Sequence, residues 1–204
     1  AGYFDHGGVQ GYSVIQSGAA GGFFGNSTTT NRAVCRSPVP TGAACLANDF
    51  NIVELLGELQ FKVGGRPLLL FVDLARNGKA DFSFASSNPT LNIPSGLNTA
   101  ASAGFTYGRA SAPGSWEVGY AYQKVEKDAL FGEWVDSDFG AGSTDSDASA
   151  VRFAYQIARN WRFNLTYLLD QTNNDVATAV TFPVSRNVFD RNYNRLQLDL
   201  NLSF

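Results

Sequence analysis

The C-terminal end of the chain alternates apolar and polar residues without interruption. From Arg195 to Phe204 every second residue is bulky and apolar. A period of two places successive side chains on opposite faces of a strand, whereas helical faces repeat every 3.6 residues. The pattern therefore predicts a strand with one fully apolar face. That face carries Leu196, Leu198, Leu200, Leu202 and Phe204, and the other carries Arg195, Gln197, Asp199, Asn201 and Ser203.

The same alternation recurs along most of the chain. Each alternating segment has about ten residues, the length that crosses a ~25 Å apolar band at a tilt of ~40°. A short segment, Gly2 to Asp5, resembles the outer end of one more strand. The seven complete strands are predicted at 52–63, 67–76, 100–110, 116–126, 147–157, 161–170 and 192–204.

Short and long connections alternate between these strands. Residues 64–66, 111–115 and 158–160 form tight turns, whereas 77–99, 127–146 and 171–192 are long. Short turns on one side and long loops on the other are typical of outer-membrane barrels, and a soluble Greek-key sandwich gives no reason for them. The sequence predicts an all-β protein: a transmembrane antiparallel up-and-down β-barrel with about eight strands in this chain. The barrel segment spans 1–204, with 7–50 as a long extracellular loop region.

Charged residues avoid the apolar faces of the predicted strands. A charge facing lipid would cost ~2–4 kcal/mol at the membrane midplane, so the charged face is expected to line the lumen. In a wide barrel these charges would contact water, and in a narrow one they would have to pair. The expected lumen-lining residues are Glu54, Glu58, Lys62, Asp73, Glu117, Arg152, Arg162, Arg195 and Asp199.

Aromatic residues gather near the strand ends that meet the short turns. If the last strand ends at the periplasmic side, these rings form an aromatic girdle at the membrane boundary. The alternative is that they are ordinary core aromatics. The expected girdle consists of Phe61, Tyr107, Trp116, Tyr155, Trp161 and Phe204.

Composition agrees with a barrel and excludes some other classes. Charged residues make up 16% of the chain, below the ~25% of soluble domains. The longest uninterrupted apolar run is 68–72, whereas a membrane helix needs ~20 residues. A net charge of −3 argues against a nucleic-acid partner. Ala1 fits either a signal-cleavage site or a cut within a longer chain.

Two stretches resemble known outer-membrane sequences. The terminal residues, with Leu198, Leu200, Leu202 and Phe204 in alternation, look like the C-terminal signal read by the barrel-assembly machinery. Residues 103–140 and 185–204 resemble the C-terminal half of the proteobacterial "putative porin" family, and the resemblance covers roughly 50–204. It implies a barrel of about sixteen strands in the Gram-negative outer membrane, in contact with lipid and lipopolysaccharide. It also implies passive transport of small solutes.

Strand number separates two functions. Eight strands enclose an interior that side chains fill, whereas sixteen leave an aqueous channel. Small residues on the inward face would leave voids in a narrow barrel, which favours the C-terminal half of a larger porin with further sequence upstream. The alternative is a small non-conducting barrel with a structural or partner-binding role, as a homo-oligomer or in an envelope complex. The small inward residues are Gly104, Gly108, Gly119, Ala121 and Ala154.

Little in the sequence indicates further chemistry. Cys35 and Cys45 lie close together, which favours a disulfide in an oxidising compartment over two free thiols. His6 is the single histidine, so neither a catalytic triad nor a zinc site is expected. No enzyme activity and no cofactor are therefore predicted. A weak calcium hypothesis rests on the acidic loop residues Asp136, Asp138, Asp145 and Asp147, which are more simply read as solvated.

Overall fold

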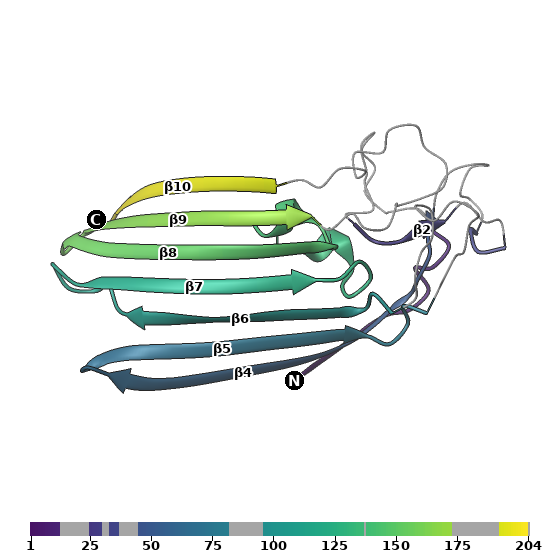
Figure 1. Cartoon of the computed structure of the whole chain (residues 1–204), viewed down its shortest axis with the longest axis horizontal. Helices are drawn as coiled ribbons and strands as arrows, with labels where there is room; N and C mark the ends of the chain where they lie inside the picture. The colour runs from purple at the N-terminus through teal and green to yellow at the C-terminus, as the bar shows by residue number, and fades with distance from the viewer. Residues whose placement is uncertain are drawn as a thin grey trace.

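A computed structural model describes residues 1–12, 25–29, 33–36, 45–81, 96–136, 138–172 and 192–203. Within this part, eight strands form one antiparallel sheet whose order follows the chain (Figure 1). A second sheet pairs two short strands, β2 (Thr28–Thr29) and β3 (Cys45–Leu46). The eight strands are β1 (Gly2–His6), β4 (Phe50–Val63), β5 (Arg66–Asn77), β6 (Thr99–Gly108), β7 (Trp116–Val125), β8 (Ser146–Ala158), β9 (Trp161–Thr172) and β10 (Asn192–Leu202).

The predicted strands are confirmed. Each of the seven long strands begins and ends within two residues of its expected bounds, and β1 is the short eighth strand. The sequence did not predict β2, β3 or the single-turn 3-10 helices η2 (Gly132–Trp134) and η3 (Gly140–Gly142). These elements have two or three residues each, too few to show a hydrophobic period. The described part of the chain contains no α-helix.

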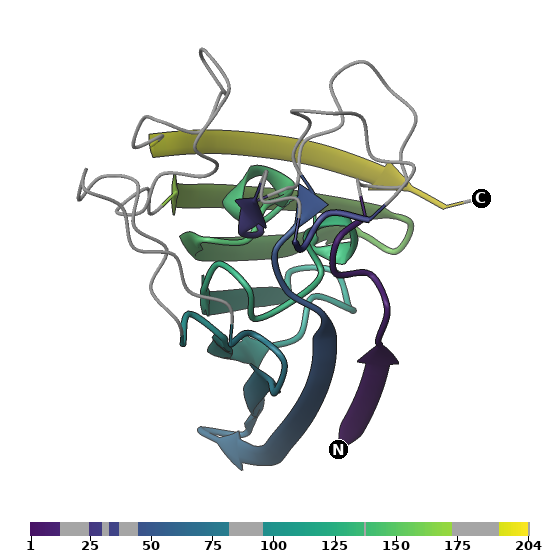
Figure 2. The same ribbon diagram turned by 90° about the vertical axis from the view of Figure 1, so that its right-hand side faces the viewer.

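The large sheet is curved but its edges do not meet. β1 and β10 are its two edge strands, and they lie at opposite ends of the curve when the sheet is seen along its strands (Figure 2). The all-β antiparallel expectation is therefore confirmed. The sheet is a curved, open wall in this structure, so the closed barrel stays a prediction.

A two-residue turn sets the register of the longest strand pair. Gly64 and Gly65 connect β4 to β5, and both have positive φ, +58° and +78°. Positive φ at both central residues is the requirement of a type I′ hairpin turn, which glycine meets without strain. Val63 then pairs with Arg66, and the pairing continues to Ile52 opposite Asn77. The turn thus fixes which β4 and β5 side chains share a face.

One face of the sheet is apolar, with exposed bulky residues on six of the seven long strands. Leu59 and Leu198 are 60% and 59% exposed although they are mid-strand leucines. Soluble monomers rarely expose contiguous apolar patches larger than a few hundred Å². No helix in the described part of the chain is long and apolar enough to cross a membrane. Further exposed residues of this outward face are Val53, Leu55, Phe61, Val63, Leu70, Val72, Leu74, Tyr120, Val151, Phe153, Tyr155, Ile157, Trp161, Leu169, Leu196, Leu200 and Leu202.

The boundary of this apolar face shifts steadily from strand to strand. We take the boundary at the end of each strand that lies away from the short turns. The last apolar residue there is Val53 on β4 and Leu196 on β10. Successive pairing places Leu196 in one row with Leu59, through Tyr167, Val151, Tyr120, Phe105 and Leu70. The boundary therefore moves from residue 53 to the level of residue 59, six residues over the six steps from β4 to β10. The boundary thus shifts by one residue (~3.3 Å along the strand) for each step of ~4.8 Å to the next strand. This ratio corresponds to a strand tilt of ~35°, a value typical of barrels.

Candidate functional site

The concave face carries most of the charged residues of the strands. Antiparallel partners share a face, so the registers show which side chains line it. All nine charged residues expected to face a lumen lie on this side, together with small residues. One row across the sheet runs from Glu58 through Phe71, Gly104, Ala121, Ala150 and Leu168 to Arg195.

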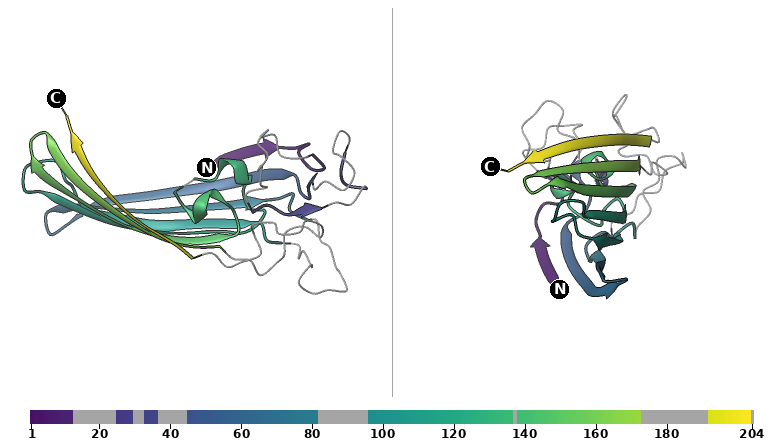
Figure 3. Two further views of the ribbon diagram at one scale, coloured as in Figure 1. Left: turned by 90° about the horizontal axis from the view of Figure 1, so that it is seen from above. Right: turned by 90° about the vertical axis from the view of Figure 1, so that its left-hand side faces the viewer.

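The connection between β7 and β8 folds across this concave face, and we name it the crossing connection. Its helices η2 and η3 lie on the side towards which the sheet curls (Figure 3). Phe131 packs with Leu46, Phe50 and Ile52 at the β4 end of the sheet. Phe139 packs against apolar residues of β7, β8 and β9, namely Ala121, Ala148, Ala150 and Leu168. The connection is therefore seated on the sheet by apolar contacts at two separate places.

Charged contacts hold the second half of the connection. Arg195 of β10 pairs with Asp138 at 2.6 Å between Nη2 and Oδ1. The guanidinium of Arg152, on β8, lies 5.9 Å from the centre of the Phe139 ring. Two basic residues of the wall thus contact the connection, one by an ion pair and one by a cation–π contact.

Buried amides join the connection to the segments that precede β4. Asn26 donates from Nδ2 to the carbonyl oxygens of Lys127 and Leu130, at 2.9 and 2.8 Å. Its Oδ1 accepts from the Gly132 N–H at 2.7 Å. Asn77, at the end of β5, donates to the carbonyls of Asp49 and Asp128. Because buried peptide groups need partners, these amides fix four chain segments to one another.

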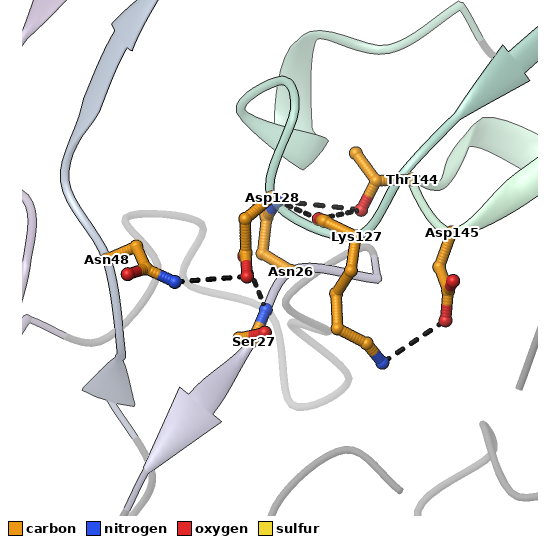
Figure 4. A network of polar contacts seen from close by, with 7 residues as sticks. All are labelled: Asn26, Ser27, Asn48, Lys127, Asp128, Thr144 and Asp145. Atoms are coloured by element: carbon orange, nitrogen blue, oxygen red, sulfur yellow. Dashed lines mark hydrogen bonds and ion pairs between the residues drawn. The ribbon is translucent and has the colours of Figure 1, made fainter. Parts of the chain in front are cut away.

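A buried pair of charged residues lies at the centre of this polar network (Figure 4). Asp128 is 4% exposed; its Oδ1 accepts from the Ser27 N–H at 2.8 Å and its Oδ2 from Asn48 Nδ2 at 3.0 Å. Lys127 Nζ lies 3.2 Å from Asp145 Oδ2. Burial raises the pKa of the Asp128 carboxyl, and the hydrogen bonds from Ser27 oppose this shift. We name this group, Asn26, Ser27, Asn48, Lys127, Asp128, Thr144 and Asp145, the outer polar cluster.

A recess opens in the concave face beside the seated connection. It has a volume of about 120 Å³. Arg162 donates from Nε to Asn164 at 2.9 Å and lies 3.5 Å from Glu117. The polar lining of the recess consists of Thr106, Glu117, Arg152, Arg162, Asn164 and Thr166.

The residues expected to form an aromatic girdle lie on the outward face beside the short turns. Trp116 contacts the Tyr107 ring at 5.8 Å, and the Arg66 guanidinium lies 4.3 Å from the Trp116 ring centre. Tyr107 donates its hydroxyl to the Val63 carbonyl. Phe61, Tyr155 and Trp161 are about 40% exposed on the same face. Phe204 lies outside the described residues, whereas Leu198, Leu200 and Leu202 face outward.

The disulfide between Cys35 and Cys45 is present, with a Cα–Cα distance of 5.6 Å. Three of the four acidic residues considered for calcium have separate side-chain partners, and Asp136 accepts from the Asp138 N–H at 2.9 Å. Asp138 pairs with Arg195, Asp145 pairs with Lys127, and Asp147 accepts from the Tyr122 hydroxyl. No group of three metal-ligating side chains occurs in the described ranges. His6 ends β1 and contacts the Trp134 ring at 4.4 Å.

Sequence reasoning interpreted the acidic segment 127–146 as a solvated loop and missed its packing. The acidic residues suggested solvent, but Phe131, Trp134 and Phe139 lie among them. Phe131 and Phe139 are buried in the structure, whereas Trp134 is 67% exposed. Large aromatic side chains in a loop favour such burial. That signal could have identified the crossing connection, although not its partners.

Comparison with known proteins identifies one family. A family described as "putative porin" matches residues 24–203, which includes β4 to β10 and the crossing connection. No curated protein and no solved structure matched the chain. The match spans most of the 204 residues, so the chain belongs to the "putative porin" family.

Proposed function

We propose that this protein is an outer-membrane porin that allows passive diffusion of small hydrophilic solutes or ions. In this proposal the outward face contacts lipid and lipopolysaccharide of a Gram-negative envelope, and the concave face lines water. The edges β1 and β10 are joined to further strands, giving a barrel of about sixteen. The whole chain forms one wall, with 7–50 on the outer side and the terminal alternation read by the assembly machinery.

The observation that carries the proposal is the contrast between the two faces. Exposed bulky apolar residues cover one side on six of the seven long strands, while every expected lumen charge lies on the other. Water on both sides would leave the apolar face unexplained, and lipid on both sides would leave the charges unexplained. The family match adds independent support, and the ~35° tilt derived from the edge of the apolar face agrees with a barrel.

The crossing connection is proposed to narrow the channel. Residues 126–136 and 138–145 occupy part of the concave face, where Phe131 and Phe139 pack on the sheet and Asp138 pairs with Arg195. A segment fixed across a water-filled lumen reduces its cross-section and thereby sets the size of solute that passes. In this role the connection must stay in place, which the outer polar cluster favours.

A second candidate function is a non-conducting barrel with a structural or partner-binding role. The observation that favours it is the packing of segments 25–29, 45–49 and 126–145 against one another at the outer end of the sheet. If these segments close the mouth completely, no solute would pass.

Conductance measurements distinguish the two functions. The folded mature protein, reconstituted in planar bilayers, is expected to produce discrete current steps in KCl. Asp138→Asn removes the ion pair with Arg195, so the connection is expected to loosen and the steps to become larger or noisier. Asp81→Asn, an exposed change just beyond β5, serves as the matched control. Wild-type protein that inserts fully yet produces no steps would support the structural barrel instead.

A further inference from the structure

The concave face presents a guanidinium without an acidic partner. Arg152 of β8 is exposed on this face, and no described carboxylate forms an ion pair with it. It makes a cation–π contact with Phe139 of the crossing connection. A cation–π contact uses none of the N–H donors of an arginine, so they stay available to a ligand.

Small residues keep the space beside Arg152 open. Gly119 is the cross-strand partner of Arg152. A Cβ at this glycine would lie 3.2 Å from the Phe105 carbonyl oxygen and 3.4 Å from Thr106 Oγ1. Ala121 and Ala154 line the same recess. A longer side chain at these positions would fill the volume in front of the guanidinium.

The other polar groups of the recess suit an anion. Arg162 contributes a second guanidinium, oriented by its bond to Asn164 and only partly neutralised by Glu117 at 3.5 Å. Thr106 and Thr166 add hydroxyl donors to the lining. With two arginines and one glutamate, the formal charge of the recess is +1. Arginine forks and hydroxyls are the donors that bind carboxylate and phosphate oxygens.

We propose that this recess is a subsite for small oxyanions, carboxylate or phosphate, on their way past the crossing connection. The inference rests on the proposed porin function and adds a solute class to it. Binding at such a site must be weak, because a passing solute has to enter and leave. The exposed position of Arg152 is consistent with weak binding.

The subsite is local, because the opposite wall is acidic. Glu54 and Glu58 of β4 and Asp73 of β5 face the same concavity. Net ion selectivity therefore reports on the whole lumen, whereas a change at Arg152 reports on the recess. The test must compare variants rather than rely on the sign of selectivity in the wild type.

The first test measures permeability ratios from reversal potentials in gradients of potassium acetate and of potassium phosphate. Arg152→Gln is expected to lower the anion-to-potassium ratio by about threefold, the effect of one exposed charge. Arg152→Lys is expected to restore part of it. Lys62→Gln removes a cation of the same face outside the recess and is the matched control. Loss for phosphate alone would narrow the subsite to phosphate.

The second test does not depend on conduction. NMR line broadening of inorganic phosphate and of labelled acetate is measured with the full chain folded in detergent, with circular dichroism as the folding control. Broadening by the wild type that is lost in Arg152→Gln supports the subsite even if no channel opens. Equal broadening by the two proteins, or permeability ratios that Arg152→Gln leaves unchanged in conducting channels, overturns the inference and leaves the porin proposal intact.

Discussion

At the residue scale, Asp128 is a buried carboxyl group whose surroundings have opposing effects on its pKa. Its carboxylate accepts two hydrogen bonds at the centre of the outer polar cluster, yet it is almost fully removed from water. Desolvation disfavours the charged form and is the largest cause of the raised pKa of Asp128. Burial therefore favours the protonated form of this side chain, whereas the hydrogen bonds from Ser27 and Asn48 favour the charged form.

The raised pKa of Asp128 predicts a pH-dependent connection. Its stabilising contribution is complete below the usual carboxyl pKa of ~3.9 and is lost as pH rises through the higher folded-state value. Amide protection of residues 126–132, corrected for intrinsic exchange, is therefore expected to be greater at about pH 4 than at about pH 7. Asp128→Asn keeps an acceptor for the Ser27 N–H and should remove the Asp128 part of this difference. Identical pH profiles for the two proteins would contradict the assignment.

At the element scale, the β2–β3 pair depends on a covalent link. Cys45 begins β3 and is fully buried, and its bond to Cys35 closes a loop with a sequence separation of ten residues. In the chain-entropy model such a loop contributes roughly 2–3 kcal/mol. A Cys35→Ser/Cys45→Ser variant is expected to lose amide protection at residues 45–49 by that amount. Protection of β8 and β9 should stay unchanged; a loss there would mean that the link supports the whole sheet.

The strands were predictable and the crossing connection was not, for a physical reason. Strands such as β5 and β10 alternate because one face meets an apolar medium and the other does not, so their pattern is local. The bonds of Asn26 join residues 101 to 106 positions apart, and no local pattern encodes such a distance. Of the site, the sequence predicted the shared face of Arg152 and Arg162, but not the recess between them or the Phe139 contact.

At the scale of the whole molecule, the two faces impose opposite requirements on neighbouring residues. Leu198 faces outward and Gln197 faces the concave side of β10. An arginine at 198 would cost ~2–4 kcal/mol near the membrane midplane, whereas one at 197 would face water. Leu198→Arg is expected to reduce folding into lipid vesicles, and Gln197→Arg should fold like the wild type. Equal folding yields, measured by protease protection, would contradict the assigned faces.

The order of the sheet has a consequence for how the protein assembles. From β4 to β10 every strand pairs with the next strand in the chain, so each hairpin forms from neighbouring segments at low entropic cost. The pairing of β1 with β4 is different, because the chain between His6 and Phe50 must first be brought back on itself. We therefore infer a directional order of folding, in which successive hairpins build the wall early and β1 joins late. The outer polar cluster joins the segment between β1 and β4 to the connection between β7 and β8. It would then form last and complete the structure.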